Sequence, residues 1–329
     1  MKRILAFLIC VLLFHAMCIS CTEEEIMDNN ELIINPMALD TIHNDTTYKD
    51  SIGNDGNNGK TINNEDKNKS SKYIVRKVGT NIVNYVTYNE SNKSAQGMAV
   101  YGNTMYRLYN TGICQLFDIS DRYNPKPLNI FALGSFGSRN HSNCAQFAPT
   151  SNFDVPLLYV SGLYGKCYVE ELSNNSSKLI QIITFNEKLI FNESTHYNLI
   201  CGDDSFLWLM GGSNTTLYFA KLIRPDVNIG DVNLSVKDVI DFWSISGYSY
   251  SASVWQGGKV YNGKLYFVFG TTSSRRHIAI YDTKTHELIE DIDLNDYIKE
   301  EPEDCEIIDN NIIITTNGGY GYYIIYPEE

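Results

Sequence analysis

The segment Gln96-Gly97-Met98-Ala99-Val100-Tyr101, followed by Gly102-Asn103 and then Met105-Tyr106-Arg107-Leu108-Tyr109, contains the unit from which the fold is predicted. A polar residue opens a short apolar strand, a two-residue turn follows, and a second apolar and aromatic strand runs back. Apolar strands joined by a short turn rich in Gly and Asn are typical of β-hairpins. The segment therefore predicts a hairpin with a polar residue at its start.

The same layout occurs five times between residues 73 and 329. The other copies begin at His141, His196, Gln256 and Asp304. In four copies a third strand is predicted at 114–118, 167–170, 217–220 and 278–282, and a fourth at 128–133, 179–185, 236–242 and 288–294. Four antiparallel strands repeated every 45 to 60 residues or so are typical of β-propeller blades.

The fifth copy ends with its third strand, at 322–326, so its fourth strand must come from elsewhere. Residues 81–86 supply an apolar strand just before the first blade, and pairing it with the last strand would remove an open sheet edge. The sequence thus predicts an all-β, five-bladed propeller closed by an N-terminal strand. Extra length around residues 225–233 leaves six blades as an alternative.

The first 20 residues are typical of a secretory signal peptide. Lys2 and Arg3 precede an apolar run that is too short to span a bilayer. The following Ile19-Ser20-Cys21 resembles the lipobox of bacterial lipoproteins, with Cys18 where that motif usually has Leu, and the acidic run 22–25 resembles the surface-export signal of Bacteroides-type lipoproteins. The resemblance implies lipidation of Cys21 and a surface-exposed position on a bacterial outer membrane. The alternative is an ordinary secreted protein cut near Ser20.

Residues 21–72 are rich in Asn, Asp, Glu, Lys and Ser and have few aromatic side chains. Such a composition buries too little apolar surface to offset the loss of backbone entropy on folding. A disordered, lipidated acidic tether is therefore predicted for 21–72, followed by the propeller at 73–329. The propeller region resembles those of Bacteroides-type surface lipoproteins through its layout, without the Asp-box of sialidases or the signature of WD repeats.

Charge and cysteine usage narrow the function. The formal net charge is −13, with no basic stripe, which disfavours nucleic acid and anionic lipid as ligands. The propeller region has an odd number of cysteines, so a complete disulfide framework is excluded and buried thiols are expected. These are Cys114, Cys144, Cys167, Cys201 and Cys305. No phosphate-binding or dinucleotide-binding motif is present, so no cofactor is predicted.

In a propeller, the first residues of the innermost strands lie around one mouth of the central axis, where ligands commonly bind. The polar side chains at these positions are the candidate ligand-binding residues. They are Gln96, His141, Asn143, His196, Asn198, Gln256, Glu303, Asp304 and Glu306, with Trp255 as a candidate stacking platform.

Four interpretations of these residues stay open. They form a pocket for a glycan or peptide, or His141, His196 and a fifth-blade carboxylate hold a metal. A glycan-active hydrolase would need two nearby carboxylates, yet acids occur on the inner strand of the fifth blade alone. In the fourth interpretation the side chains merely satisfy buried backbone groups. We expect a non-catalytic binding or scaffold module without a metal, and keep a hydrolase or an adhesion subunit of an envelope complex as alternatives.

Overall fold

The structure, a computed structural model, describes residues 73–79, 94–137, 140–148, 155–173, 175–185, 196–202, 205–249, 252–317 and 321–328. All of them belong to one compact unit of the chain, residues 64–329. The predicted signal peptide, Cys21 and the predicted tether lie outside the described residues. Among the described residues, no helix is long and apolar enough to cross a membrane.

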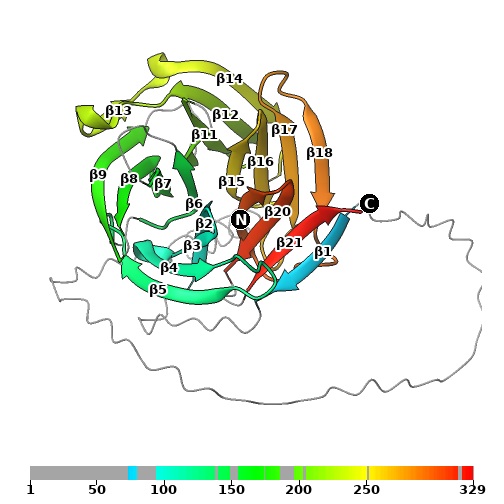
Figure 1. Ribbon diagram of the computed structural model, residues 1–329. Helices are drawn as coiled ribbons and strands as arrows, with labels where there is room; N and C mark the ends of the chain where they lie inside the picture. The colour runs from blue at the N-terminus through cyan, green and yellow to red at the C-terminus, as the bar shows by residue number, and fades with distance from the viewer. Residues whose placement is uncertain are drawn as a thin grey trace, which may run out of the picture. The chain divides into compact units, whose positions relative to one another are not determined.

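Five antiparallel sheets surround a central axis (Figure 1). Blade 1 contains β2 (Ala95–Tyr101), β3 (Thr104–Tyr109), β4 (Ile113–Asp118) and β5 (Lys126–Ala132); blade 2 contains β6 (Cys144–Ala148), β7 (Leu157–Gly162), β8 (Lys166–Ser173) and β9 (Ser176–Phe185); blade 3 contains β10 (His196–Cys201), β11 (Phe206–Gly212), β12 (Thr216–Ile223) and β14 (Val239–Ser246); blade 4 contains β15 (Trp255–Tyr261), β16 (Lys264–Phe269), β17 (His277–Asp282) and β18 (Leu288–Asp293); blade 5 contains β19 (Pro302–Ile308), β20 (Asn311–Thr316), β21 (Tyr322–Pro327) and β1 (Tyr73–Val78). The inner strands β2, β6, β10, β15 and β19 contact one another around the axis. The domain is a five-bladed β-propeller, as the sequence predicted.

An N-terminal strand closes the ring, but it is not the predicted one. β1 pairs antiparallel with β21, with Tyr73 opposite Pro327 and Val78 opposite Tyr322 (Figure 1). Lys77 forms an ion pair with Glu300, which anchors β1 to the loop before β19. The predicted strand at 81–86 lies outside the described residues. Both segments alternate apolar and polar residues, and only the pairing register distinguishes them.

The extra length in the third repeat does not form a sixth blade. It contains β13 (Val232–Leu234), which pairs parallel to β9 and so adds a fifth strand to blade 2. The buried Gln181 side chain holds this insertion, because its Nε2 donates to the carbonyl oxygens of Asp226 (3.0 Å) and Gly230 (2.7 Å). The insertion therefore covers the outer edge of blade 2, an edge that would otherwise be open to pairing.

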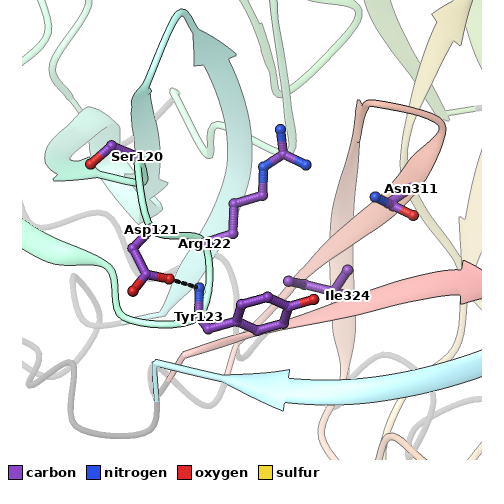
Figure 2. Close-up of a pocket in the computed structure, with 6 residues that line it drawn as sticks. All are labelled: Ser120, Asp121, Arg122, Tyr123, Asn311 and Ile324. Atoms are coloured by element: carbon purple, nitrogen blue, oxygen red, sulfur yellow. Dashed lines mark hydrogen bonds between the residues drawn. The ribbon is translucent and has the colours of Figure 1, made fainter.

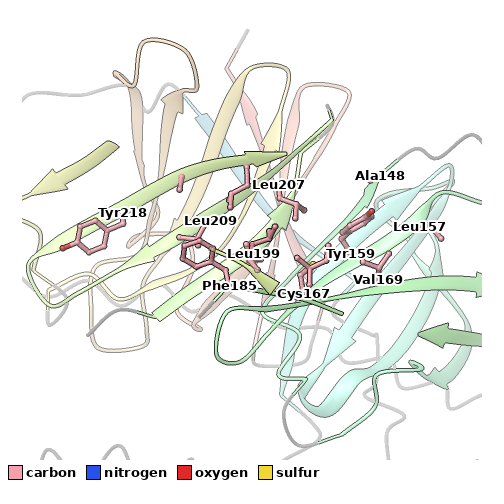
Figure 3. Packing of buried hydrophobic residues seen from close by; sticks show 14 residues of the cluster. Ala148, Leu157, Tyr159, Cys167, Val169, Phe185, Leu199, Leu207, Leu209 and Tyr218 are labelled. Atoms are coloured by element: carbon pink, nitrogen blue, oxygen red, sulfur yellow. The ribbon is translucent and has the colours of Figure 1, made fainter. Parts of the chain in front are cut away.

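The hydrophobic core lies between neighbouring blades, where the apolar faces of two sheets meet. Figure 3 shows the cluster between blades 2 and 3, which includes Tyr159, Leu209 and Tyr218. Aromatic side chains fill much of this space, which explains part of the chain's high tyrosine content. The thiols of Cys114, Cys144, Cys167 and Cys305 are all buried in these layers.

Candidate functional site

Three of the five inner strands carry a β-bulge at the same end of the axis. Between Ala95 and Met98 on β2, and between Trp255 and Gly258 on β15, one residue more is present than on the paired strand. On β19 the extra residue is Glu303, between Pro302 and Asp304. Bulges are common beside functional sites because they redirect side chains. We call this end of the axis, where the inner strands begin, the mouth.

Two glycines let the inner strands approach closely below the mouth. Gly97 N–H donates to the Ser142 carbonyl at 2.6 Å, and a Cβ at Gly97 would lie 2.4 Å from that oxygen. A Cβ at Gly257 would lie 2.5 Å from the Glu303 carbonyl of blade 5 and 2.8 Å from the Asn143 carbonyl of blade 2. Backbones from different blades therefore meet near the axis, and any larger residue would force them apart.

Asp304 occupies the space where these strands converge, and its side chain is fully buried. Its Oδ2 accepts hydrogen bonds from the N–H groups of Met98 (2.9 Å) and Ala145 (3.1 Å), and its Oδ1 accepts one from Cys305 N–H (2.9 Å). Burial raises the pKa of Asp304, and these hydrogen bonds oppose the shift. One carboxyl thus joins blades 5, 1 and 2.

Glu306 makes the next crossing, two residues farther along β19. Its Oε1 lies 2.5 Å from Nζ of Lys259 in blade 4, and its Oε2 accepts Val100 N–H of blade 1 at 3.1 Å. Both charged side chains are buried. A buried ion pair of this kind is stable only while both partners are present.

Amide side chains complete the connections around the axis. Asn198 Nδ2 donates to the Gln256 carbonyl at 3.1 Å, and Gln146 Nε2 donates to the Val260 carbonyl at 3.0 Å. Both side chains are buried. We refer to Gln146, Asn198, Lys259, Asp304 and Glu306 as the axis plug. Through it, side chains of blades 2, 3, 4 and 5 bond to neighbours across the axis, so the predicted site residues Asn198, Asp304 and Glu306 hold the ring together.

The mouth has a different chemistry. Glu301 precedes β19 and Asn317 follows β20, so both lie at the mouth end of blade 5. Glu301 Oε1 accepts a hydrogen bond from Gln256 Nε2 (2.7 Å), and its Oε2 accepts one from Asn317 Nδ2 (2.6 Å). Burial raises the pKa of Glu301, and the Gln256 hydrogen bond opposes this. We call Gln256, Glu301, Glu303 and Asn317 the mouth cluster.

Glu303 is the unusual member of the mouth cluster. Its side chain is only 4% exposed, yet it accepts no hydrogen bond from any residue that the structure describes. Burial, followed by the neighbouring Glu301 and Asp304 carboxyls, raises the pKa of Glu303 well above its ordinary value. The neutral acid is therefore favoured, and its O–H has no acceptor within the described part of the chain. Buried polar groups normally have a partner, which makes this carboxyl exceptional.

Two further polar atoms nearby share this lack of a partner. Oδ1 of Asn143 and Oγ1 of Thr316 are buried and make no hydrogen bond within the described ranges. Thr316 lies opposite Pro302 in the register of blade 5, one step from Glu303. The mouth end therefore has more hydrogen-bonding capacity than the described protein groups use.

The remaining predicted residues are placed differently. Gln96 is buried and donates to Ser94 Oγ at 3.1 Å, so it stays within blade 1. Trp255 is half-buried and packs against the cluster between blades 3 and 4, with Phe267 6.3 Å from its ring. His196 begins β10, but its side chain lies outside what the structure describes.

His141 is not on a strand, and this corrects the predicted equivalence of the two His-x-Asn segments. His141 and Ser142 have φ values of +55° and +51°, so the chain turns in the left-handed region before β6 begins at Cys144. His141 Nδ1 lies 2.9 Å from Oδ1 of Asn110, and burial lowers the pKa of His141. Strand alternation therefore does not place His141 and Asn143 on one face.

Among the described residues, no group of three or more His, Cys, Asp or Glu side chains is arranged to hold a metal ion. Since the His196 side chain is not described, the predicted combination of His141, His196 and an acid is not tested.

Sequence reasoning missed Glu301, Asn317 and Lys259. Lys259 lies in the segment Gln256-Gly257-Gly258-Lys259-Val260-Tyr261, which repeats the pattern of residues 96–101 with Lys in place of Ala99. A charged residue at a position that is apolar in another blade points toward a special environment. Glu301 and Asn317 flank strands, and the sequence contains no feature that singles them out.

Comparisons with known proteins give a fold and no family. No family model matches this chain, and no curated protein matches it. Among solved structures, a glutaminyl cyclase from Myxococcus xanthus has 10% identity and a TM-score of 0.44 over 77% of this chain and 94% of its own. An exo-β-1,3-galactanase from Phanerochaete chrysosporium has 13% identity and a TM-score of 0.45 over 79% of this chain and 65% of its own.

The WD40 β-propeller domain of Doa1 has 10% identity and a TM-score of 0.39 over 77% of this chain and 97% of its own. This chain thus spans slightly less than two thirds of the galactanase chain and nearly all of the other two. At such identities and TM-scores, no inference about activity follows.

Proposed function

We propose that this protein is a surface lipoprotein of a bacterial outer membrane whose propeller binds a glycan at the mouth without catalysis. The observation that supports the binding role is Glu303, a buried carboxyl without a hydrogen-bond partner in the described residues. It lies beside Glu301, which two amides hold in a fixed orientation. A preformed polar site with unused hydrogen-bonding groups is what a polar ligand requires.

The chemistry of the mouth cluster favours a neutral, hydroxyl-rich ligand. Protonated Glu303 donates a hydrogen bond, while Glu301 and the amide oxygen of Gln256 accept them. Sugar hydroxyls both donate and accept, so they match this mixture. The net charge of −13 disfavours a polyanion. A basic peptide is the competing ligand, because it would pair with Glu301 through charge.

Binding to oligosaccharides tests this proposal. Calorimetric titration of the soluble 73–329 domain with a panel of neutral oligosaccharides should identify a ligand. Glu301→Gln and Gln256→Ala should each weaken its binding by about 1–3 kcal/mol, the usual cost of leaving a buried partner unpaired. Asn129→Ala, which removes a surface hydrogen bond to Asn175 on the outer strands, is the matched control. Binding of a basic peptide but no oligosaccharide, or equal effects of all three substitutions, would contradict the proposal.

The anchor is tested separately. Lipidation needs the sulfur of Cys21, and acyl chains contribute about 0.8 kcal/mol per buried CH₂, so two or three chains anchor the protein stably. Cys21→Ala should abolish labelling with radioactive palmitate and release the protein from the membrane fraction. Labelled Cys21→Ala protein would show that the lipid is attached elsewhere.

A second candidate function rests on the proximity of Glu301 and Glu303. Two carboxyls with raised pKa values are the equipment of glycoside hydrolysis. Glu303 would protonate the leaving glycosidic oxygen, and Glu301 would take a proton from the water that attacks the anomeric carbon. Reducing-sugar release by the wild-type domain, abolished in Glu303→Gln, would establish this function. Binding without any release favours the non-catalytic proposal.

A further inference from the structure

A second concave site lies at the opposite end of the axis, where blade 5 meets blade 1. β19 leads away from the mouth, so Asn311, which follows the turn after β19, lies at the far end of the blade. β4 runs in the same direction as β2, and the loop after it therefore reaches the same end. Between them is a hollow of about 360 Å³, shown in Figure 2. Its lining residues are Ser120, Asp121, Arg122, Tyr123, Asn311 and Ile324.

The loop that forms one wall is fixed on both sides. Asp121 Oδ1 accepts the N–H of Tyr123 at 3.0 Å, which closes a tight turn within the loop (Figure 2). The Arg122 carbonyl accepts the hydroxyl of Tyr322 at 2.5 Å, and the Arg122 guanidinium lies 2.5 Å from Asp309. These bonds join blade 1 to blade 5, so the hollow is preformed, which lowers the entropic cost of binding.

The side chains around the hollow combine an aromatic surface with polar groups. The Tyr123 ring is 46% exposed, and the Arg76 guanidinium lies 4.4 Å from its centroid. The Asn311 amide makes no hydrogen bond with any described residue, and Ile324 adds an apolar surface beside the Tyr123 ring (Figure 2). An exposed aromatic ring beside an unused amide is suited to the apolar face and the hydroxyls of a sugar ring.

The local charges balance. Arg76 and Arg122 contribute two positive charges, and Asp121 and Asp309 contribute two negative ones. The Asp121 and Arg122 side chains are already engaged within the protein, so the hollow presents no free charge that would select an ionic ligand. We propose that this hollow is a second carbohydrate site that binds one or two neutral sugar units, independently of the mouth.

The test uses the 73–329 domain carrying Gln256→Ala, so that binding at the mouth is weakened and the two sites are distinguished. Saturation-transfer NMR with neutral mono- and disaccharides should still detect binding in this background. Adding Tyr123→Ala or Asn311→Ala should weaken that binding at least tenfold. Tyr261→Ala is the matched control, because this tyrosine is 38% exposed at the end of β15 and does not line the hollow.

Each outcome is decisive. Loss of binding with Tyr123→Ala and Asn311→Ala, but not with Tyr261→Ala, supports the second site. No saccharide binding in the Gln256→Ala background, or equal loss with all three substitutions, overturns it. Circular dichroism and thermal melting of each variant show whether a loss comes from unfolding. Because Gln256→Ala alone is compared with the wild-type domain, failure of the mouth and failure of the hollow give different patterns.

Discussion

Glu303 and Asp304 are adjacent in the sequence and both are buried on β19, yet their surroundings differ completely. Asp304 accepts three backbone N–H groups from three inner strands. Glu303, on the bulge, accepts none from the described residues. The comparison extends to the axis plug and the mouth cluster as a whole. In the plug, side chains connect the blades, whereas the mouth retains hydrogen-bonding groups that the described residues do not use.

This difference shows that residue type and burial do not by themselves define a binding site. A buried carboxyl that is surrounded by donors stabilises the fold, and its removal leaves those donors unpaired. A buried carboxyl without donors costs stability, so a protein that keeps one is expected to use it. Substitutions at the two places should therefore change different properties.

The largest effect is expected in the axis plug. Glu306→Ala leaves Lys259 buried without its partner, which should lower the free energy of unfolding by about 3–5 kcal/mol. Urea denaturation followed by circular dichroism measures it. The double variant Lys259→Met with Glu306→Leu removes both charges and should recover much of the loss. An unrecovered double variant would mean that packing, rather than the ion pair, is responsible.

A smaller effect is expected where the inner strands approach each other. Gly257→Ala places a methyl group against the Glu303 and Asn143 carbonyls, and overpacking of this kind costs about 1–3 kcal/mol. Gly102→Ala is the control, because its Cβ would meet nothing within 4 Å and only the left-handed φ of +58° is penalised. Melting temperatures compare the two variants. If Gly102→Ala is the more damaging, the strands at the axis are less close than described.

The smallest effect concerns pH. The pKa of Glu303 is raised in the folded state, so the folded protein binds more protons than the unfolded chain between pH 4.5 and the raised value. Stability due to this group is therefore full below pH 4.5 and is lost as the pH rises through the folded pKa. Glu303→Gln removes this contribution and should flatten the decline, with a difference on the order of 1 kcal/mol at pH 8. Identical pH profiles for both proteins would refute it.

Much of the fold could be predicted because each blade is built from local pairings. Short apolar strands and turns repeat in the sequence, and neighbouring strands in the chain are neighbours in the sheet. The closing strand is the exception, since β1 pairs with β21 across almost the whole domain. Residues 73–78 and 81–86 have similar alternation, and no local feature decides between them.

The site could be located at the mouth but not resolved in detail. Strand alternation is disrupted by the bulges, so the sequence did not show that Glu303 and Asp304 have different surroundings. The left-handed conformation of His141 is equally invisible, because the residue is neither Gly nor Asn. Glu301 and Asn317 meet only because the loops before β19 and after β20 are adjacent in blade 5.

The unfolding free energies of two isosteric variants test the central claim most directly. Asp304→Asn places an amide where the carboxylate accepted three N–H groups, so at pH 7 it should lose about 2–3 kcal/mol. Glu303→Gln should lose nothing or gain stability, because no described donor depends on that carboxyl. Urea titration of both variants under one set of conditions gives the comparison. Equal losses for the two would contradict the division between a structural axis and a ligand-binding mouth.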